Sequence, residues 1–244
     1  MGARHRRPLL LALLAAAAGG GCLAYRAGFP GRARAAAYDL AMSRVEAAFL
    51  GEGRRRLLAG ARGRVLEVGI GTGANLPHYP GSAELDIVGI DPDPAKLTRT
   101  REKATSLGLA VDLRPGRAYP LPYPDASFDA VVFALVLCTV PDQAAALAEA
   151  RRVLRPGGRL LFLEHVRSAE PRLARWQDRV TPVWRLVGGG CHPNRDTRAA
   201  IEAAGFEMEW IIDRVEPRMP LPILQPGVLG GAVRRADQQA HRVP

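Results

Sequence analysis

Cysteine, lysine and aromatic residues are all scarce in this sequence. Its three cysteines, Cys22, Cys138 and Cys191, are odd in number and widely separated, which argues against a disulfide framework and is typical of a reducing compartment. No cysteines and histidines stand at the spacing of a metal-binding motif, so we expect no metal ion. Lysine occurs only at positions 96 and 103, so arginine carries nearly all of the positive charge.

The sequence does contain enough apolar residues for a folded domain, and its charge is unevenly distributed. Hydrophobic residues make up 48% of the 244 positions, which suits one α/β domain with a short appendage. Residues 1–64 hold twelve arginines and three acids, a net charge of +9, whereas residues 65–244 are close to neutral at +1. A basic arm can contact anionic lipid or nucleic acid, but biased composition also explains it. Because no nucleic-acid-binding motif accompanies the charge, we expect no nucleic-acid partner.

Residues 1–36 form a basic and apolar N-terminal segment. Three arginines precede an uncharged stretch, residues 8–25, that contains a run of leucines. This stretch is rich in alanine and glycine and marginal in length. Three interpretations therefore remain open: an uncleaved apolar helix that meets a membrane surface, a cleaved signal, and a tail or mis-assigned start. Cys22 is a poor lipidation site, because Gly19 stands where an aliphatic residue is expected.

The strongest local signal is a glycine turn that follows a short apolar run. Glu67 lies near the end of that run, and Gly69, Gly71 and Gly73 follow at every second position. A turn of this kind delivers a nucleotide-like ligand from a parallel strand to the start of a helix. Asp91 ends the next apolar run, where an acidic side chain can accept hydrogen bonds from ribose hydroxyls.

Short apolar runs alternate with helical patterns through the rest of the chain. We expect strands at residues 64–68, 86–90, 110–113, 128–135, 159–164 and 206–213, and helices at 38–50, 74–78, 94–107, 143–154 and 197–204. This alternation predicts an α/β fold with a doubly wound, mostly parallel sheet in residues 37–216. Residues 217–244 are rich in proline and glycine and predict a C-terminal tail.

Four blocks in this order resemble the class I S-adenosylmethionine-dependent methyltransferases: residues 65–73, 89–91, 124–129 and 152–158. Residues 73–80 (GANLPHYP), 135–138 (LVLC), 164–166 (EHV) and 190–195 (GCHPNR) are similar to a narrower subgroup. That subgroup includes bacterial small-molecule methyltransferases and vertebrate membrane-associated thiol methyltransferases. The resemblance covers residues 38–215 and implies a seven-stranded Rossmann-like sheet with S-adenosylmethionine as the cofactor.

The resemblance also implies which residues hold the cofactor. The three glycines of the turn would let the backbone approach it, Glu67 would orient the turn or reach its ammonium group through water, and Asp91 would accept from its ribose. The adenine edge would lie near Ala118 and Tyr119, although Arg117 stands where many relatives have an accepting acid. The full set of expected cofactor residues is Glu67, Gly69, Gly71, Gly73, Asn75, Asp91, Pro92, Ala118, Tyr119, Ala134 and Leu135.

Methyl transfer from a sulfonium needs alignment and exclusion of water more than acid–base help. A thiol or phenol acceptor still gains from a nearby base. His165, which follows an expected strand, is the first candidate, His192 the second and His78 the third. Each of them has an alternative interpretation as a structural histidine, and Cys138 suits a packed small hydrophobe better than a nucleophile.

The predicted function is transfer of a methyl group to a small, lipophilic acceptor: a thiol, a phenol or a lipid head group. A cytosolic cofactor favours a cytoplasmic protein, membrane-associated where the N-terminal segment meets a bilayer. Two alternatives stay open. One is a catalytically degenerate protein of the same fold that binds cofactor or lipid. The other is an NAD-dependent dehydrogenase, since residues 69–74 satisfy a relaxed dinucleotide pattern.

Overall fold

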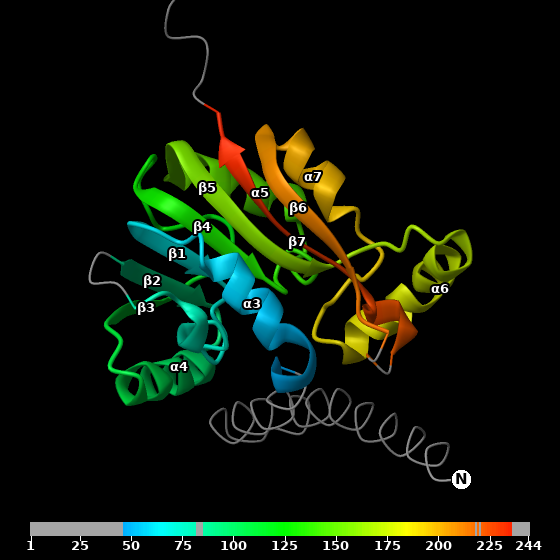
Figure 1. Cartoon of the computed structure of the whole chain (residues 1–244), viewed down its shortest axis with the longest axis horizontal. Coiled ribbons are helices and arrows are strands. Elements are labelled where there is room, and N and C mark those ends of the chain that lie inside the picture. Colours follow the sequence, from blue (N-terminus) through cyan, green and yellow to red (C-terminus); the bar gives the residue numbers. More distant parts are fainter. Residues whose placement is uncertain (1–45, 82–84, 218, 220, 236–244) are drawn as a thin grey trace, which may run out of the picture.

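The computed structural model describes residues 46–81, 85–217, 219 and 221–235 (Figure 1). The stretch 8–25 and the apolar helix expected there lie outside the described residues. The described chain forms an α/β fold around one seven-stranded sheet, with the strand order β3-β2-β1-β4-β5-β7-β6. Those strands are β1 (Arg64–Val68), β2 (Asp86–Asp91), β3 (Val111–Pro115), β4 (Phe128–Ala134), β5 (Leu154–His165), β6 (Phe206–Val215) and β7 (Pro226–Arg234).

The sheet is mostly parallel because helices carry the chain back between its strands. Strands β1 to β5 pair in parallel, and β7 is antiparallel to both β5 and β6. The central strand β4 is buried along nearly its whole length, as expected for a parallel strand covered on both faces. This confirms the predicted doubly wound sheet.

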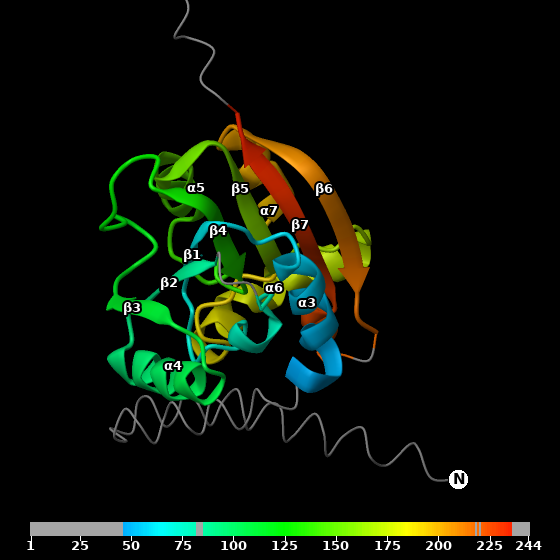
Figure 2. The ribbon, with the colours of Figure 1, turned by 60° about the vertical axis from the view of Figure 1, so that its left-hand side comes forward.

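Helices cover both faces of the sheet (Figures 1 and 2). On one face, α3 (Gly51–Leu58) and α4 (Pro94–Ser106) bury Leu57 and Leu97 in one apolar core. On the other face, α5 (Gln143–Val153) and α7 (Thr197–Ala203) bury Leu147 and Ile201 in a second core. The side chain of Asp93 caps α4 by accepting from the N–H of Ala95 at 2.9 Å, which fixes where that helix begins.

The C-terminal tail predicted at residues 217–244 is wrong for residues 222–224 and 226–234, and its last nine residues lie outside the described residues. Residues 222–224 form a short 3-10 turn, η3, and β7 lies between β5 and β6 inside the sheet. Two glycines in β7 suggest a loop in the sequence, but in the structure large side chains occupy the space that a Cβ would need at these positions. A Cβ on Gly230 would lie 2.5 Å from the ring of Phe162, and one on Gly231 would lie 2.5 Å from the indole of Trp210. Aromatic packing against a bare backbone therefore explains the glycine content of this strand.

Three further expectations need correction. The helix expected after the glycine turn is only the 3-10 turn η2 (Leu76–His78). Strand β5 begins at Leu154, five residues earlier than expected, because Leu154 already pairs with Phe128 of β4; the register then shifts before Arg159, and Gly157 in between has a φ of +79°. The expected helix at 38–50 reaches the described residues only at 46–50, which form the π-turn η1 (Glu46–Leu50) in place of an α-helix, and α3 follows it.

Helix α6 (Pro171–Val187) was not expected from the sequence at all. Two prolines and four arginines obscure its apolar pattern, yet it lies beside the edge where the parallel strands end (Figure 1). The fully buried Gln177 anchors this helix, because its amide donates to the backbone carbonyls of Val166 and Pro193. Within the described parts of the chain, we find no helix with the length and apolarity needed to cross a membrane.

Candidate functional site

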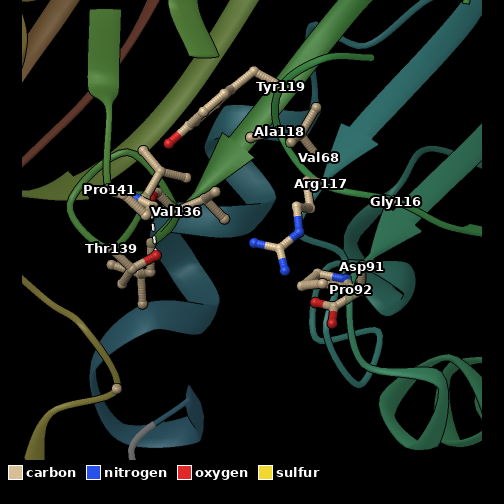
Figure 3. Close-up of a pocket in the computed structure, with 14 residues that line it drawn as sticks. Val68, Asp91, Pro92, Gly116, Arg117, Ala118, Tyr119, Val136, Thr139 and Pro141 are labelled. Carbon is tan, nitrogen blue, oxygen red and sulfur yellow. Dashed lines mark hydrogen bonds between the residues drawn. The ribbon is translucent and has the colours of Figure 1, made fainter. Parts of the chain in front are cut away.

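A cavity of about 280 Å³ opens at the carboxyl ends of β1, β2 and β4 (Figure 3). This is the edge of a doubly wound sheet where ligands bind. It is lined by Val68, Gly69, Asp91, Pro92, Gly116, Arg117, Ala118, Tyr119, Leu135, Val136, Thr139, Val140, Pro141 and Gly189. The wall is mainly backbone and apolar side chain, and Asp91 and Arg117 bring the charged groups.

Asp91 both lines this cavity and holds the glycine turn in place. One of its carboxylate oxygens accepts from the N–H of Gly71 at 3.1 Å, and the other accepts from the N–H of Asp93 at 2.9 Å. Burial raises the pKa of Asp91, although Lys96 and these backbone bonds oppose the rise. A carboxylate has lone pairs beyond these two bonds, so Asp91 can still accept from a diol in the cavity.

Two glycines of the turn, Gly69 and Gly71, lack a side chain for different reasons. Gly69 has a φ of +71°, and a Cβ there would lie 2.6 Å from Val136 of the facing loop. Gly71 has a φ of +59°, but a Cβ there would meet only a backbone oxygen, at 3.9 Å. The protein itself therefore leaves room at Gly71, and a closely approaching ligand is a reason for keeping that room free.

Glu67 lies behind the turn and does not line the cavity. Its carboxylate accepts from Asn75 at 2.9 Å and from the hydroxyl of Tyr79 at 2.8 Å, and Arg54 donates to Asn75 at 2.7 Å. Burial raises the pKa of Glu67 to about 7, and bonding to Tyr79 and the nearby Arg54 oppose the rise. These contacts favour the first of the two roles expected for Glu67, which is to orient the turn.

The sequence-derived cofactor residues divide into two groups. The cavity is lined by Gly69, Asp91, Pro92, Ala118, Tyr119 and Leu135. Glu67, Gly71, Gly73, Asn75 and Ala134 are not among the residues that line it. Arg117 also lines the cavity, and Figure 3 shows its guanidinium extended toward the side where Asp91 lies. The hydroxyl of Tyr119 accepts from the N–H of Asp142 at 3.0 Å, which ties together two sides of the cavity.

Leu135 separates this cavity from a second, smaller one. The smaller cavity holds about 30 Å³ and is lined by Phe49, Leu50, Leu135, Leu163, Glu164, His165, Arg214, Glu216, Met219, Leu224, Gln225 and Gly227. Leu135 has a φ of +61°, which is unusual for a residue with a branched side chain. Strained residues of this kind gather at functional sites, and this one forms the wall that the two cavities share.

The loop after β4 is held by a buried carboxylate that the sequence did not reveal as important. Glu164 accepts from the N–H groups of Val136 and Leu137, both at 2.9 Å, and of Cys138 at 3.1 Å. Burial raises the pKa of Glu164, and the three backbone bonds oppose the rise. Because residues 135, 136, 139 and 140 of this loop line the main cavity, Glu164 sets the shape of that cavity from behind.

The structure places the three candidate histidines differently. His165 lines the smaller cavity, and its Nδ1 lies 3.7 Å from the sulfur of Cys191. Burial lowers the pKa of His165, but the neighbouring Cys191 raises it by a larger amount, so the net shift is upward. A raised pKa leaves less neutral imidazole to accept a proton. His192 contacts the carbonyl of Cys138 through Nδ1 at 3.3 Å, and His78 ends η2 behind the glycine turn.

Cys138 and Cys191 are brought together although 53 positions separate them in the sequence. The sulfur atoms of both cysteines and a ring nitrogen of His165 lie within 4.8 Å of one another. Bonding to Cys138 and to His165 lowers the pKa of Cys191 to about 5 against the effect of burial. No local spacing could have shown this cluster, because its three members come from three separate loops and strand ends.

Comparison with known proteins identifies the family. Residues 66–162 match the methyltransferase domain model. The chain is 38% identical over 186 residues to the human thiol S-methyltransferase TMT1B, covering 72% of this chain and 74% of that protein. It is 37% identical over 157 residues to the phosphatidylethanolamine N-methyltransferase of Cereibacter sphaeroides, covering 59% of this chain and 74% of the relative.

The fold is also that of solved methyltransferases. A geranyl diphosphate methyltransferase in complex with S-adenosylmethionine aligns with a TM-score of 0.62 and 18% identity, covering 85% of this chain and 93% of the other. The residues at the main cavity fit this cofactor: the turn leaves room at Gly71 and Asp91 keeps acceptor capacity. The dehydrogenase alternative is thereby set aside. The chain belongs to the class I S-adenosylmethionine-dependent methyltransferases, in the subgroup that contains the thiol S-methyltransferases.

Proposed function

We propose that this enzyme methylates a small lipophilic acceptor, first of all a thiol, that enters through the smaller cavity. The observation that carries this proposal is the shared wall at Leu135, which borders both cavities. A cofactor in the larger cavity and an acceptor in the smaller one would meet at this residue. Phe49, Leu163 and Met219 line the acceptor side, and a cavity of about 30 Å³ admits only a small group, so the reactive end of a lipophilic acceptor would lie there.

The residues of this chain have three tasks in such a reaction. The bound cofactor supplies a methyl group already activated by its sulfonium charge. Asp91 and the glycine turn would fix the donor, and the loop held by Glu164 would align it with the acceptor. Apolar side chains at the junction would exclude water. His165 and His192 remain candidates for positioning or deprotonating the acceptor, and His165 is the one that lines the acceptor cavity.

The named relatives support a small or lipid-like acceptor. They include thiol S-methyltransferases, a phosphatidylethanolamine N-methyltransferase and a demethylmenaquinone methyltransferase. The near-neutral charge of residues 65–244 disfavours a nucleic-acid acceptor, whose backbone is neutralised by a basic groove. A thiol leads among the acceptors because, of these named relatives, the thiol S-methyltransferase matches more of this chain than the other two.

A membrane surface is part of the proposal, because it would deliver a lipophilic acceptor. The stretch 8–25 is one segment that would contact the membrane, and α6 is a second. The solvent-facing side of α6 carries Val183, 67% exposed, and Leu186, 64% exposed, beside Trp176 and Val187. Arg172, Arg175 and Arg179 lie on the same side. Apolar residues interleaved with arginines on one helix face suit the surface of an anionic bilayer.

A panel of acceptors tests the chemistry. The full chain is incubated with S-adenosylmethionine and, in separate reactions, a small alkyl thiol, a phenol, a phosphatidylethanolamine vesicle and a demethylated quinone, and S-adenosylhomocysteine formation is followed. We expect turnover on the thiol and its loss in Asp91→Ala, with Asp112→Ala on the exposed part of β3 as the matched control. Tight cofactor binding with no turnover on any acceptor would instead favour the catalytically degenerate alternative.

Sedimentation with anionic vesicles tests the membrane contribution. We expect the double variant Val183→Asp and Leu186→Asp to reduce binding of the full chain, and deletion of residues 1–36 to reduce it further, with activity on a soluble thiol retained. Leu107→Asp removes an exposed leucine at the end of α4 and should leave binding unchanged. If the double variant still binds vesicles as well as the wild type, α6 does not contribute to membrane binding.

A further inference from the structure

The cluster of Cys138, His165 and Cys191 has a composition that the methyltransferase mechanism does not require. Each residue offers one soft or borderline ligand atom, and these three atoms lie within 4.8 Å of one another. Cys138 is 1% exposed and Cys191 5% exposed. Neither forms a disulfide. Two buried free thiols beside an imidazole are the donor set of a site for a thiophilic divalent cation.

The geometry is close to what a tetrahedral zinc centre needs. Zinc lies about 2.3 Å from sulfur and about 2.0 Å from imidazole nitrogen, which places neighbouring ligand atoms roughly 3.5 to 3.8 Å apart. The sulfur of Cys191 and Nδ1 of His165 are 3.7 Å apart, inside this range. All three ligand atoms lie within 4.8 Å of one another, so the widest separation exceeds the range by at most about 1 Å.

Hydrogen bonds outside the cluster hold the two cysteine-bearing loops in position. The N–H of His192 donates to the carbonyl of Cys138 at 2.6 Å, so the loop after α6 is pinned to the loop after β4. Glu164 accepts from the N–H of Cys138 at 3.1 Å. Outer contacts of this kind orient metal ligands before the ion arrives.

With both thiols deprotonated, a divalent cation would balance the charges around the cluster. Two thiolates would carry two negative charges, and Glu164 would carry a third beside them. Arg195 supplies one positive charge close to both cysteines and to Glu164, and it donates to the carbonyl of Leu137 at 2.6 Å. A cation of charge two would bring this buried group to neutrality, which the low dielectric of the interior favours.

We propose that Cys138, His165 and Cys191 bind a zinc ion at the wall of the acceptor cavity. The three ligands leave one of four positions open, as in zinc sites that bind a substrate or water. His165 lines the smaller cavity, so the ion would be next to the space assigned to the acceptor.

A role in acceptor binding follows if the thiol acceptor of the proposed function is correct. A thiol entering the open position would bind zinc through sulfur as a thiolate, and its proton would pass to solvent. The sulfur–hydrogen bond breaks, a sulfur–zinc bond forms, and no redox change occurs. Zinc binding itself does not depend on this step and can be measured without any acceptor.

The test is metal binding by the full chain. The protein is stripped with a chelator and titrated with Zn²⁺ against a chromophoric competitor, and Co²⁺ is used as a spectroscopic probe. We expect one ion per chain and, with Co²⁺, sulfur-to-metal charge transfer with the intense visible bands of tetrahedral coordination. Cys138→Ser and Cys191→Ser should each weaken Zn²⁺ binding by roughly 100-fold or more, since loss of an outer contact alone costs 10- to 100-fold.

Controls keep metal loss separate from misfolding and from failure of the proposed function. Cys22→Ser removes the third cysteine and should leave Zn²⁺ affinity unchanged. S-adenosylmethionine binding and thermal unfolding of each variant report the fold independently of the metal. Wild-type protein that binds no Zn²⁺, or binds it equally well in both cluster variants, would overturn the proposal. Zinc binding without thiol methylation would instead leave the site standing and reject the acceptor.

Discussion

The proposed active site has a cofactor side and an acceptor side, and the residues of these two sides are distributed very differently along the sequence. On the cofactor side, Glu67, the glycine turn and Asp91 lie within 25 consecutive residues and meet across neighbouring parallel strands β1 and β2. On the acceptor side, the cavity wall combines η1, the end of β5, β6 and the segment before β7. A local motif therefore builds the half to which we assign the cofactor, whereas distant segments build the half to which we assign the acceptor.

The largest expected effect lies on the acceptor side, in β7. In Gly230→Ala the new Cβ would stand 2.5 Å from the ring of Phe162 and 2.8 Å from the carbonyl of Trp210. Overpacking against both a side chain and backbone should lower the free energy of unfolding by about 3 kcal/mol, measured by urea denaturation. Gly81→Ala, with no atom within 4 Å of its Cβ, is the control. Equal stability of both variants would mean that β7 is not packed as described.

The next effect is a pH dependence from the cofactor side. The pKa of Glu67 is raised to about 7 by burial, so between its ordinary value and pH 7 the folded state holds a proton that the unfolded state has lost. The contribution of Glu67 to the free energy of unfolding is therefore fully present at low pH and is lost as the pH rises through this window, by about 3 kcal/mol. Glu67→Gln should flatten that part of the curve in denaturation measured across pH.

Glu149 gives a control of opposite sign for the pH experiment. Its pKa is lowered, chiefly by bonding to Arg152, so its contribution is present at neutral pH and lost as the pH falls. Glu149→Gln should therefore change only the acidic end of the curve. An unchanged slope between pH 5 and 7 in Glu67→Gln would show that another group titrates there.

A tenfold effect is expected on cofactor affinity at Gly71. Gly71 and Gly108 have φ values of +59° and +67°, and neither would place a Cβ against a neighbouring side chain. Alanine at either position should cost about 1 kcal/mol of stability for the backbone conformation alone. Only Gly71→Ala should weaken S-adenosylmethionine binding, by about tenfold, in calorimetric titration. Equal affinities would place the cofactor away from Gly71.

The contrast explains which features could be predicted from the sequence. Strands β1, β2 and β4, helix α4 and the residues around Asp91 were found because their signals are local: apolar runs, a capping aspartate, glycines at fixed spacing. Strand β7 was missed because Gly230 and Gly231 are explained only by Phe162 and Trp210, which are distant in sequence. Helix α6 was missed because its exposed side mixes valine and leucine with arginine. The cysteine cluster depends on three tertiary contacts.

The smallest predicted effect lies at Leu135, where the two sides of the site meet. Leu135→Ala removes the shared wall and keeps the strained φ of +61°, whereas Leu135→Gly removes both. The glycine variant should therefore be the more stable of the two by about 1 kcal/mol, although both should lose methyl transfer to a similar extent. Ala134, one residue earlier in β4, should show the usual order, with glycine less stable than alanine. The order at Leu135 is read from paired denaturation curves. The usual order, with the glycine variant less stable, would make Leu135 an ordinary cavity wall. The reversed order would show that the boundary between cofactor and acceptor is maintained at a cost in stability.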